Sequence, residues 1–262
     1  MKNIYLNAGT LNEVFTEIQT SFNGVLNSNN NEFKLTLNTD LIKGNIDGIT
    51  FINGITSIQA SLTFFDDVTL SIESFSNSSI VFAYCNEGHF RHSYGISGQQ
   101  FTVQKQHTAI ESSNRSVNSI LYFKKNNPVQ FSIIKVETLS LELNSTNSLL
   151  SDLKKTFVNK QPNFTYHSIQ NLRIAEKWNQ LKAITEQGMV GHILKKDLIQ
   201  SIVALEIEDN TDPVLKMARG IKRSTLLQVN ETKKIYSFIK QYSFDVIYNK
   251  VIGSKSRLFS KD

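Results

Sequence analysis

The alternation of apolar and polar residues between Phe33 and Glu142 constrains the fold of this chain more than any other feature. Over this stretch the hydrophobic period is two, as expected of strands that bury one face. Many short strands are typical of a β-sandwich or a β-barrel, and closing the sheet would hide its edges. Turn-forming residues divide the stretch at Asn53-Gly54, Asp66-Asp67, Glu87-Gly88, Gly95 to Gly98 and Asn126 to Pro128.

This alternation and the residues before it predict the elements of the N-terminal part. Leu11 to Phe22 is expected to be a helix, because Val14, Phe15 and Ile18 fall on one face. Asn27 to Asn31 is interpreted as a polar loop. The expected strands are Phe33 to Leu37, Ile49 to Ile52, Ser57 to Phe65, Val68 to Glu73, Ser79 to Cys85, His89 to Tyr94, Gln100 to Gln104, Ser119 to Phe123 and Val129 to Val136.

After Ser148 the period returns to that of a helix. A first helix opens at Leu149, and Pro162 ends that region. One apolar stripe then runs through Ile169, Leu172, Ala175, Trp178, Leu181 and Ile184, and a second through Ile193, Leu194, Leu198, Ile202 and Leu205. Glu206 to Pro213 is acidic and then broken by proline, so we interpret it as a linker. The two amphipathic helices either pair across a twofold axis to form a homodimer or pack on their own barrel.

Positive charge is concentrated at the C-terminal end. Residues 213 to 262 contain 11 Lys and Arg against 3 Asp and Glu, a net charge of +8, whereas residues 1 to 150 carry −3. A basic module on a neutral body indicates a polyanionic partner, because lysine and arginine on phosphates release condensed counterions. The alternative is a solvated basic tail.

The order of elements in this basic segment favours nucleic acid. Asn230 and Ser243 are candidate caps of two amphipathic helices, Gly253 provides a turn, and Ser254 caps a third helix. This order is the helix-turn-helix plan, in which the second helix of the motif enters the major groove of double-stranded DNA. The predicted DNA-binding residues are Ser254, Lys255, Ser256, Arg257 and Lys261.

The stretch from Ser243 to Leu258 resembles the first helix-turn-helix of AraC/XylS-type bacterial transcription regulators. It differs at Tyr248, where the family usually has alanine, and in the inverted order Ile252-Gly253. Three further stretches are similar to the family's sensing domain, linker helix and joining helix, in the expected order. These are Phe82 to Gly95, Ile169 to Ala175 and Gly191 to Ile202.

The resemblance implies a fold class, an organisation and a function. We expect an α+β chain with a cupin-like effector-sensing barrel over 1–148, a helical linker and dimerisation region over 149–212, and a partial helix-turn-helix over 213–262. The family has two such units, and this sequence stops at Asp262 inside the first recognition helix, so we expect a C-terminally truncated form. The first alternative is an incomplete regulator that dimerises and binds effector but holds DNA weakly or not at all.

A metal-dependent cupin enzyme is the second alternative. Its candidate ligands are Glu87, His89, His92 and His107. Positions 89 and 92 differ by three, so on one strand their side chains point to opposite faces. The sequence also lacks a Gly-rich phosphate loop and a Gly-x-Ser-x-Gly elbow. We therefore expect neither catalysis nor a metal or cofactor.

A small-molecule effector pocket at the barrel mouth is the expected use of this region. Its candidate residues are Tyr84, His89, Phe90, His92 and Tyr94. Cys85 is the one cysteine, so an intrachain disulfide is excluded, and it is expected to be a buried strand thiol. Neither a signal peptide nor an apolar stretch of about 20 residues is present, so we expect a cytoplasmic protein without a membrane partner.

Overall fold

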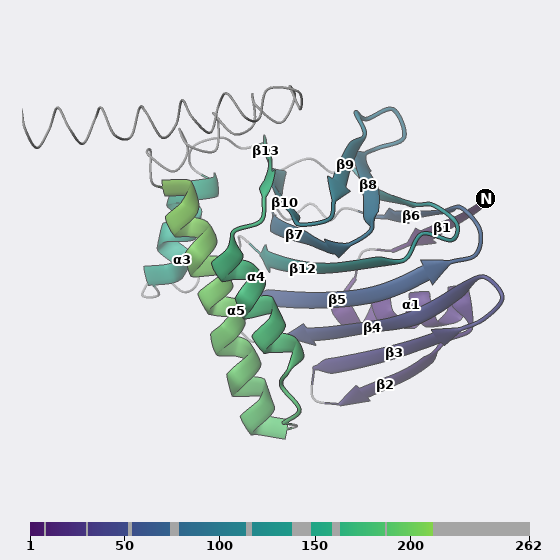
Figure 1. Cartoon of the computed structure of the whole chain (residues 1–262), viewed down its shortest axis with the longest axis horizontal. Coiled ribbons are helices and arrows are strands. Elements are labelled where there is room, and N and C mark those ends of the chain that lie inside the picture. The colour runs from purple at the N-terminus through teal and green to yellow at the C-terminus, as the bar shows by residue number, and fades with distance from the viewer. Residues whose placement is uncertain are drawn as a thin grey trace, which may run out of the picture. The chain divides into compact units, whose positions relative to one another are not determined.

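The computed structural model describes residues 1–7, 9–29, 31–51, 54–73, 79–113, 117–137, 148–158, 163–186 and 188–211. Met1–Thr211 form one compact unit, in which strands and helices occupy separate layers (Figure 1). The α+β class expected from the sequence is confirmed. None of the described helices has the length and apolar character that crossing a bilayer requires.

Two sheets face each other and enclose the first hydrophobic core. The larger sheet has the order β13 (Asn163–Ile169), β10 (His107–Ser113), β7 (Ser79–Glu87), β12 (Val129–Glu137), β5 (Ile55–Phe64), β4 (Ile42–Thr50), β3 (Glu32–Asn38) and β2 (Val25–Asn29). The smaller sheet has the order β1 (Lys2–Leu6), β6 (Val68–Ile72), β11 (Ser119–Phe123), β8 (His89–Tyr94) and β9 (Phe101–Gln104). All neighbouring strands are antiparallel except β1 and β6, which are parallel.

The helix α1 (Leu11–Phe22) packs against this first core, at the position expected from the sequence. Thr10 caps it: the backbone amide of Glu13 donates to the Thr10 side chain, and the Glu13 carboxylate accepts from the Thr10 backbone. Asn23 ends it in the left-handed conformation. Phe15, Ile18 and Phe22 are buried on the face that meets the sheets.

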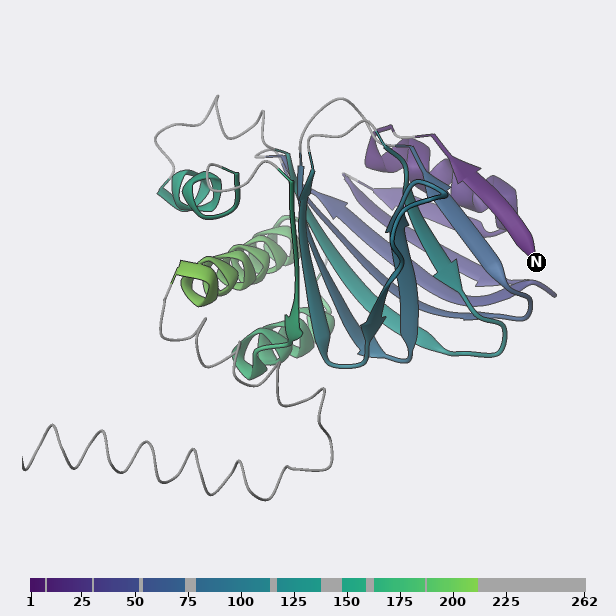
Figure 2. The ribbon, with the colours of Figure 1, turned by 90° about the horizontal axis from the view of Figure 1, so that it is seen from above.

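The second hydrophobic core lies on the outer face of the larger sheet. Figure 2 shows α3 (Ser148–Leu153), α4 (Leu172–Lys182) and α5 (Gly188–Thr211) together on that side. Strand β7 explains how one sheet serves two cores, because Phe82 and Tyr84 face the helices while Ala83 and Cys85 face the barrel. Burial raises the pKa of the Cys85 thiol to about 11, and the expectation of a buried strand thiol is confirmed.

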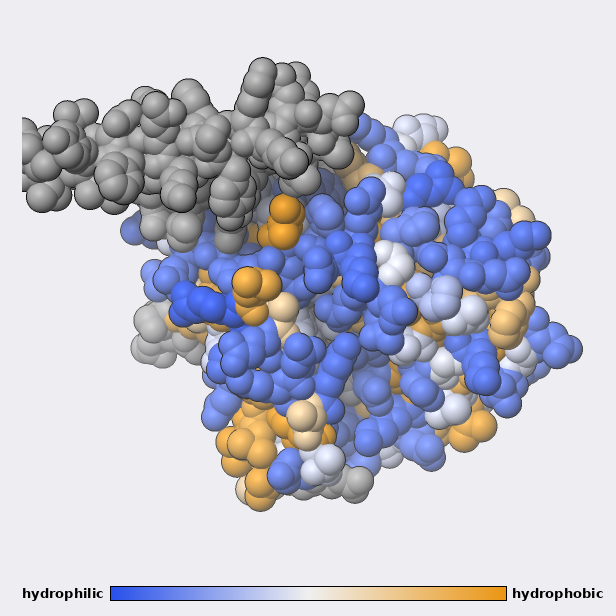
Figure 3. All heavy atoms as spheres, viewed as in Figure 1, coloured by the Kyte–Doolittle hydropathy of each residue, from blue (hydrophilic) through white to orange (hydrophobic). Residues whose placement is uncertain are grey.

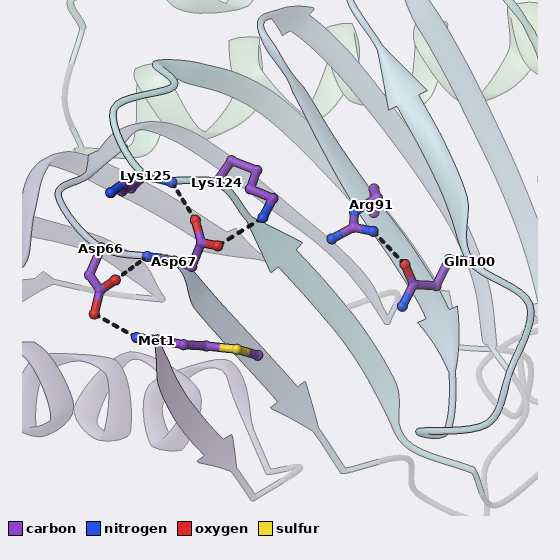
Figure 4. A network of polar contacts seen from close by, with 7 residues as sticks. All are labelled: Met1, Asp66, Asp67, Arg91, Gln100, Lys124 and Lys125. Atoms are coloured by element: carbon purple, nitrogen blue, oxygen red, sulfur yellow. Dashed lines mark hydrogen bonds and ion pairs between the residues drawn. The ribbon is translucent and has the colours of Figure 1, made fainter.

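Polar contacts hold one margin of the smaller sheet together (Figure 4). The N-terminal ammonium of Met1 lies 2.8 Å from Asp66, and Lys124 lies 2.8 Å from Asp67. The backbone amide of Lys125 donates to the same Asp67 carboxylate at 2.9 Å. The first contact joins the residue before β1 to the turn after β5, and the other two join that turn to the turn after β11. The first strand, which the sequence pattern did not predict, forms by pairing with β6 from Lys2↔Val68 to Leu6↔Ile72.

Four strands were missing from the sequence expectation: β1, β2, β10 and β13. The strand expected at Ile49 to Ile52 covers only the end of β4, which begins at Ile42 and ends at Thr50. The interpretation of Asn27 to Asn31 as a loop is wrong through Asn29, because β2 pairs its backbone with β3 from Val25↔Thr36 to Asn29↔Glu32. The region after 149 is also not helical throughout, because β13 pairs with β10 along its whole length. Ile169 therefore belongs to a strand, and α4 begins at Leu172, which is exposed.

The expected linker from Glu206 is wrong as far as Thr211, because α5 continues through it. Glu206, Asp209 and Asn210 are buried although they are polar. The Tyr84 hydroxyl donates to Glu206 Oε1 at 3.1 Å, and the Asn171 amide donates to Asp209 Oδ2 at 2.7 Å. These bonds satisfy polar groups that would otherwise destabilise a buried helix end. The expected boundaries near 148 and 212 stay predictions.

Candidate functional site

A cluster of polar side chains lies between the two sheets, where β8 and β10 end and β11 begins. The Glu111 carboxylate is its centre, with Oε1 3.0 Å from Nδ1 of His92 and Oε2 accepting a hydrogen bond of 2.8 Å from the Tyr94 hydroxyl. On the other side of the imidazole, Nε2 of His92 lies 2.9 Å from Oγ of Ser119. Four side chains from three strands therefore form one chain of polar contacts, which we call the barrel-end cluster. The contact between Glu111 and Nδ1 of His92 is an ion pair and lacks the geometry of a hydrogen bond.

Strand alternation places these side chains on the inner faces. His92 follows the core residue Phe90 by two positions, and Ser119 precedes the core residue Leu121 by two. Glu111 likewise follows Ala109, which belongs to the same core. Register completes the arrangement within the smaller sheet, where Ser119 pairs with Tyr94 and Leu121 pairs with His92.

The cluster keeps Glu111 ionised. Burial by itself would raise the pKa of this carboxyl, but the close contact and charge of His92, the hydrogen bond from Tyr94 and the charge of His167 outweigh burial, and the pKa is lowered. Burial and the neighbouring Glu111 charge raise the pKa of the Tyr94 hydroxyl. Tyr94 therefore remains a donor, and its ring meets the His92 ring edge-on at 4.8 Å.

The aromatic residue Phe101 lies close to the cluster on β9. Its ring stacks on His167 of β13 at a centroid distance of 5.1 Å. Because β9 and β13 are the edge strands of the two sheets, this contact joins them across the barrel. The side chain of His167 belongs to the barrel-facing positions of β13, since His167 pairs with Ala109.

The structure brings together two of the five predicted effector residues, His92 and Tyr94. Tyr84 is on the opposite face of the larger sheet, with its ring 5.3 Å from Trp178. Phe90 packs in the apolar interior, 5.3 Å from Phe131, and His89 is exposed. The expectation that positions 89 and 92 point to opposite faces agrees with this difference in burial. The predicted DNA-binding residues Ser254, Lys255, Ser256, Arg257 and Lys261 lie outside the described residues.

The candidate metal ligands do not converge. Glu87 and His89 are exposed near a turn whose glycine, Gly88, has a φ of +71°, and a Cβ at this position would clash with the carbonyl of Pro128. Nδ1 of His107 lies 2.9 Å from the backbone oxygen of Lys105. Within the part of the chain that the structure describes, no three His, Cys, Asp or Glu side chains are grouped to hold a metal ion.

An open cleft of about 410 Å³ lies between α4 and α5. Its lining is mostly charged and consists of Arg173, Glu176, Lys177, Ser201, Ala204, Leu205 and Glu208. Arg173 spans it with an ion pair of 3.2 Å to Glu208, and both side chains are largely exposed. Exposed ion pairs of this kind contribute little binding energy. The barrel-end cluster is the better candidate site, because its groups are buried, oriented and chemically coupled.

No protein-family model matches the chain, and no curated protein sequence matches it. Solved structures are similar to it in part. The AraC-like transcriptional activator CuxR is 10% identical over 62% of this chain and 56% of its own, with a TM-score of 0.36. ToxT from Vibrio cholerae is 9% identical over 60% and 57%, with a TM-score of 0.36. The cupin domain of an XRE-family regulator from Enterobacter cloacae is 11% identical over 37% and 94%, with a TM-score of 0.27.

The solved structures that are similar in part to this chain include AraC-like regulators and a cupin domain. The chain spans less than two thirds of the length of CuxR and ToxT. Sequence reasoning missed Glu111 and Ser119. The signal for Glu111 was a polar residue in the alternating run His107 to Ser113, which was not predicted to be a strand.

Proposed function

We propose that this protein is a bacterial transcription regulator of the AraC type, in which the barrel senses a small-molecule effector and the basic C-terminal segment contacts double-stranded DNA. The observation that carries the proposal is the net charge of +8 over residues 213 to 262, combined with the helix-turn-helix order that the sequence predicts for that segment. The protein acts in the cytoplasm, where it reaches its operator. No covalent chemistry is needed for this role.

The effector is proposed to bind near the barrel-end cluster. Polar groups inside an otherwise apolar barrel orient a small ligand, while apolar neighbours provide the contact area. His92 and Tyr94 come from the predicted set, and Glu111 joins them. Effector binding there shifts the population of barrel and helix arrangements, and so changes how the DNA-contacting segment is presented.

The DNA contact is tested by two substitutions with different expected signatures. Arg257→Ala should weaken binding to a selected operator by about 1–3 kcal/mol and relax base choice at one position, as expected of a bidentate guanine contact. Lys255→Ala should weaken all duplexes about equally and reduce the slope of log K against log salt by about one. Fluorescence anisotropy with labelled duplexes over a salt series measures both.

The matched control is Lys43→Ala, which removes an exposed cation from β4 in the barrel and should leave DNA binding unchanged. If the wild-type chain shows no salt-dependent binding to any duplex, the proposed DNA contact is wrong. In that case the alternative of a regulator that dimerises without holding DNA would replace it.

The homodimer is proposed to form through the first two turns of α5. Met189, Val190, Ile193 and Leu194 lie on one side of that helix and are exposed, Met189 by 81%. Figure 3 shows apolar atoms gathered at the end of α5 where the helix begins. The second half of the predicted stripe is used differently, because Ile202 and Leu205 are buried against the chain's own sheet. We therefore place the self-contact at the exposed part.

The dimer prediction uses a charge-matched pair of variants. Combining Met189→Lys with Ile193→Lys should weaken association about tenfold or more, because two apolar side chains lose their burial. Asp197→Lys adds the same charge at another exposed position of α5 and should keep the dimer. Light scattering after size-exclusion chromatography distinguishes the species. A dimer that survives the double substitution would place the interface elsewhere.

A further inference from the structure

We propose that Ser119 is an activated nucleophile, and that the barrel-end cluster transfers the acyl group of an ester to Ser119 and then to water. This activity is separate from the proposed transcription regulation and requires neither DNA nor a second subunit. Its three groups come from three strands: Ser119 begins β11, His92 lies on β8, and Glu111 lies on β10.

The contacts of the imidazole favour one tautomer when the ring is neutral. Nδ1 of His92 lies 3.0 Å from Oε1 of Glu111 in an ion-pair contact that lacks hydrogen-bond geometry. Because the carboxylate is an acceptor only, this contact favours a proton on Nδ1. Nε2 then carries a lone pair and accepts from the hydroxyl of Ser119, whose Oγ is 2.9 Å away. Both distances fall within the reach that nucleophile, base and orienting carboxylate require.

Tyr94 holds the carboxylate in place. Its hydroxyl donates to Oε2 of Glu111 at 2.8 Å, so each carboxylate oxygen has a polar partner. The lowered pKa of Glu111 agrees with an ionised group at this position. An ionised Glu111 stabilises the imidazolium that forms when His92 takes the proton of the serine.

Solvent exposure is lower at the carboxylate and the base than at the nucleophile, as catalysis needs. Glu111 and His92 are buried, whereas Ser119 is only half-buried. The base and its carboxylate are thus shielded from water, and the nucleophile is the member that solvent reaches. Such a constellation is recognised by geometry rather than by a local motif, so the missing Gly-x-Ser-x-Gly elbow does not oppose it.

The reaction balances without a further reagent. Ser119 Oγ forms a bond to the carbonyl carbon of the ester, its proton moves to Nε2 of His92, and the bond from carbon to the alcohol oxygen breaks. The departing alkoxide takes the proton from His92 and leaves as alcohol. Water then attacks the acyl-serine with His92 again as base, and the products are a carboxylic acid and free Ser119.

A fluorophosphonate probe tests the nucleophile on the whole purified chain. Ser119 Oγ would form a bond to phosphorus, fluoride would leave, and the serine proton would depart with it through His92. Intact mass and peptide mapping should show one adduct, at Ser119, which Ser119→Ala abolishes. The exposed Ser61 provides the matched position, because Ser61→Ala should leave the labelling rate unchanged.

Substitutions within the cluster show whether Ser119 is labelled because it is activated or only because it is exposed. Glu111→Gln should lower the labelling rate by about 10²–10⁴-fold, because the orienting charge is lost while the side-chain size is kept. Tyr94→Phe removes the hydrogen bond to Oε2 of Glu111 but keeps the carboxylate charge, so it should lower the labelling rate less than Glu111→Gln does. Hydrolysis of p-nitrophenyl acetate by the same variants should follow the same order.

Denaturation provides a test that does not depend on a folded variant. In urea the wild-type chain loses the contact between Ser119 and His92, so labelling of Ser119 should fall to the rate of other serines. Absence of an adduct at Ser119 in the folded wild type would overturn the proposal. An equal labelling rate in folded Glu111→Gln, or in urea, would overturn it as well.

Discussion

Trp178→Ala should lower the free energy of unfolding by about 3–5 kcal/mol, the range for large aromatic residues removed from a core. Trp178 is fully buried in the second core, and its ring packs on Tyr84 at 5.3 Å. The substitution opens a cavity at the contact between α4 and the larger sheet. Because Trp178 is the one tryptophan of the chain, denaturation should be followed by far-ultraviolet circular dichroism.

Leu172→Ala is the matched control on the same helix. Leu172 is 85% exposed, so its truncation should change stability by no more than about 0.5 kcal/mol. A similar decrease in the free energy of unfolding of both variants would show that Trp178 is not the main contact between α4 and the sheet.

Glu111→Gln should produce the second large effect, a weaker dependence of the free energy of unfolding on pH. The lowered pKa of Glu111 means that the folded state favours the carboxylate more than the unfolded chain does. Its contribution is therefore complete above the ordinary value of 4.5 and is lost as the pH falls through the lowered folded value. The wild type should lose stability on acidification more steeply than the variant.

Urea denaturation at a series of pH values below neutrality measures this difference. The two stability curves should lie farthest apart above the ordinary pKa of Glu111 and converge at acid pH. Glu137→Gln changes an exposed carboxyl at the end of β12 and should reproduce the wild-type curve. Parallel curves for the wild type and Glu111→Gln would mean that His92 and Tyr94 do not lower the pKa of the buried carboxyl.

Local patterns predicted much of the fold. The helix at Leu11 to Phe22 and the strands at His89 to Tyr94 and Ser119 to Phe123 have the bounds expected from the sequence. In each of them periodicity and turn or cap residues agree. The strands that escaped prediction depend on distant partners: β1 on its pairing with β6, and β13 on its pairing with β10.

In the candidate site, too, residues with a clear local pattern were predicted and residues that depend on distant pairing were not. His92 and Tyr94 were found because they lie in an aromatic strand with a clear pattern. Glu111 and Ser119 were missed because only the pairing of distant strands brings them to His92. Tyr84 was placed in the pocket although it faces the helices, since a strand buried on both faces gives no sign of which side a residue occupies.

The larger sheet contributes one face to each of the two hydrophobic cores. On β7 the neighbours Tyr84 and Cys85 point to opposite faces of the sheet. A single layer of strands therefore separates the interior of the barrel from the core that packs against α4 and α5. Close-packed interiors transmit displacement rather than absorbing it. Any molecule that spreads the strands from inside would therefore displace the Tyr84 hydroxyl, and with it the bond that anchors the far end of α5 at Glu206.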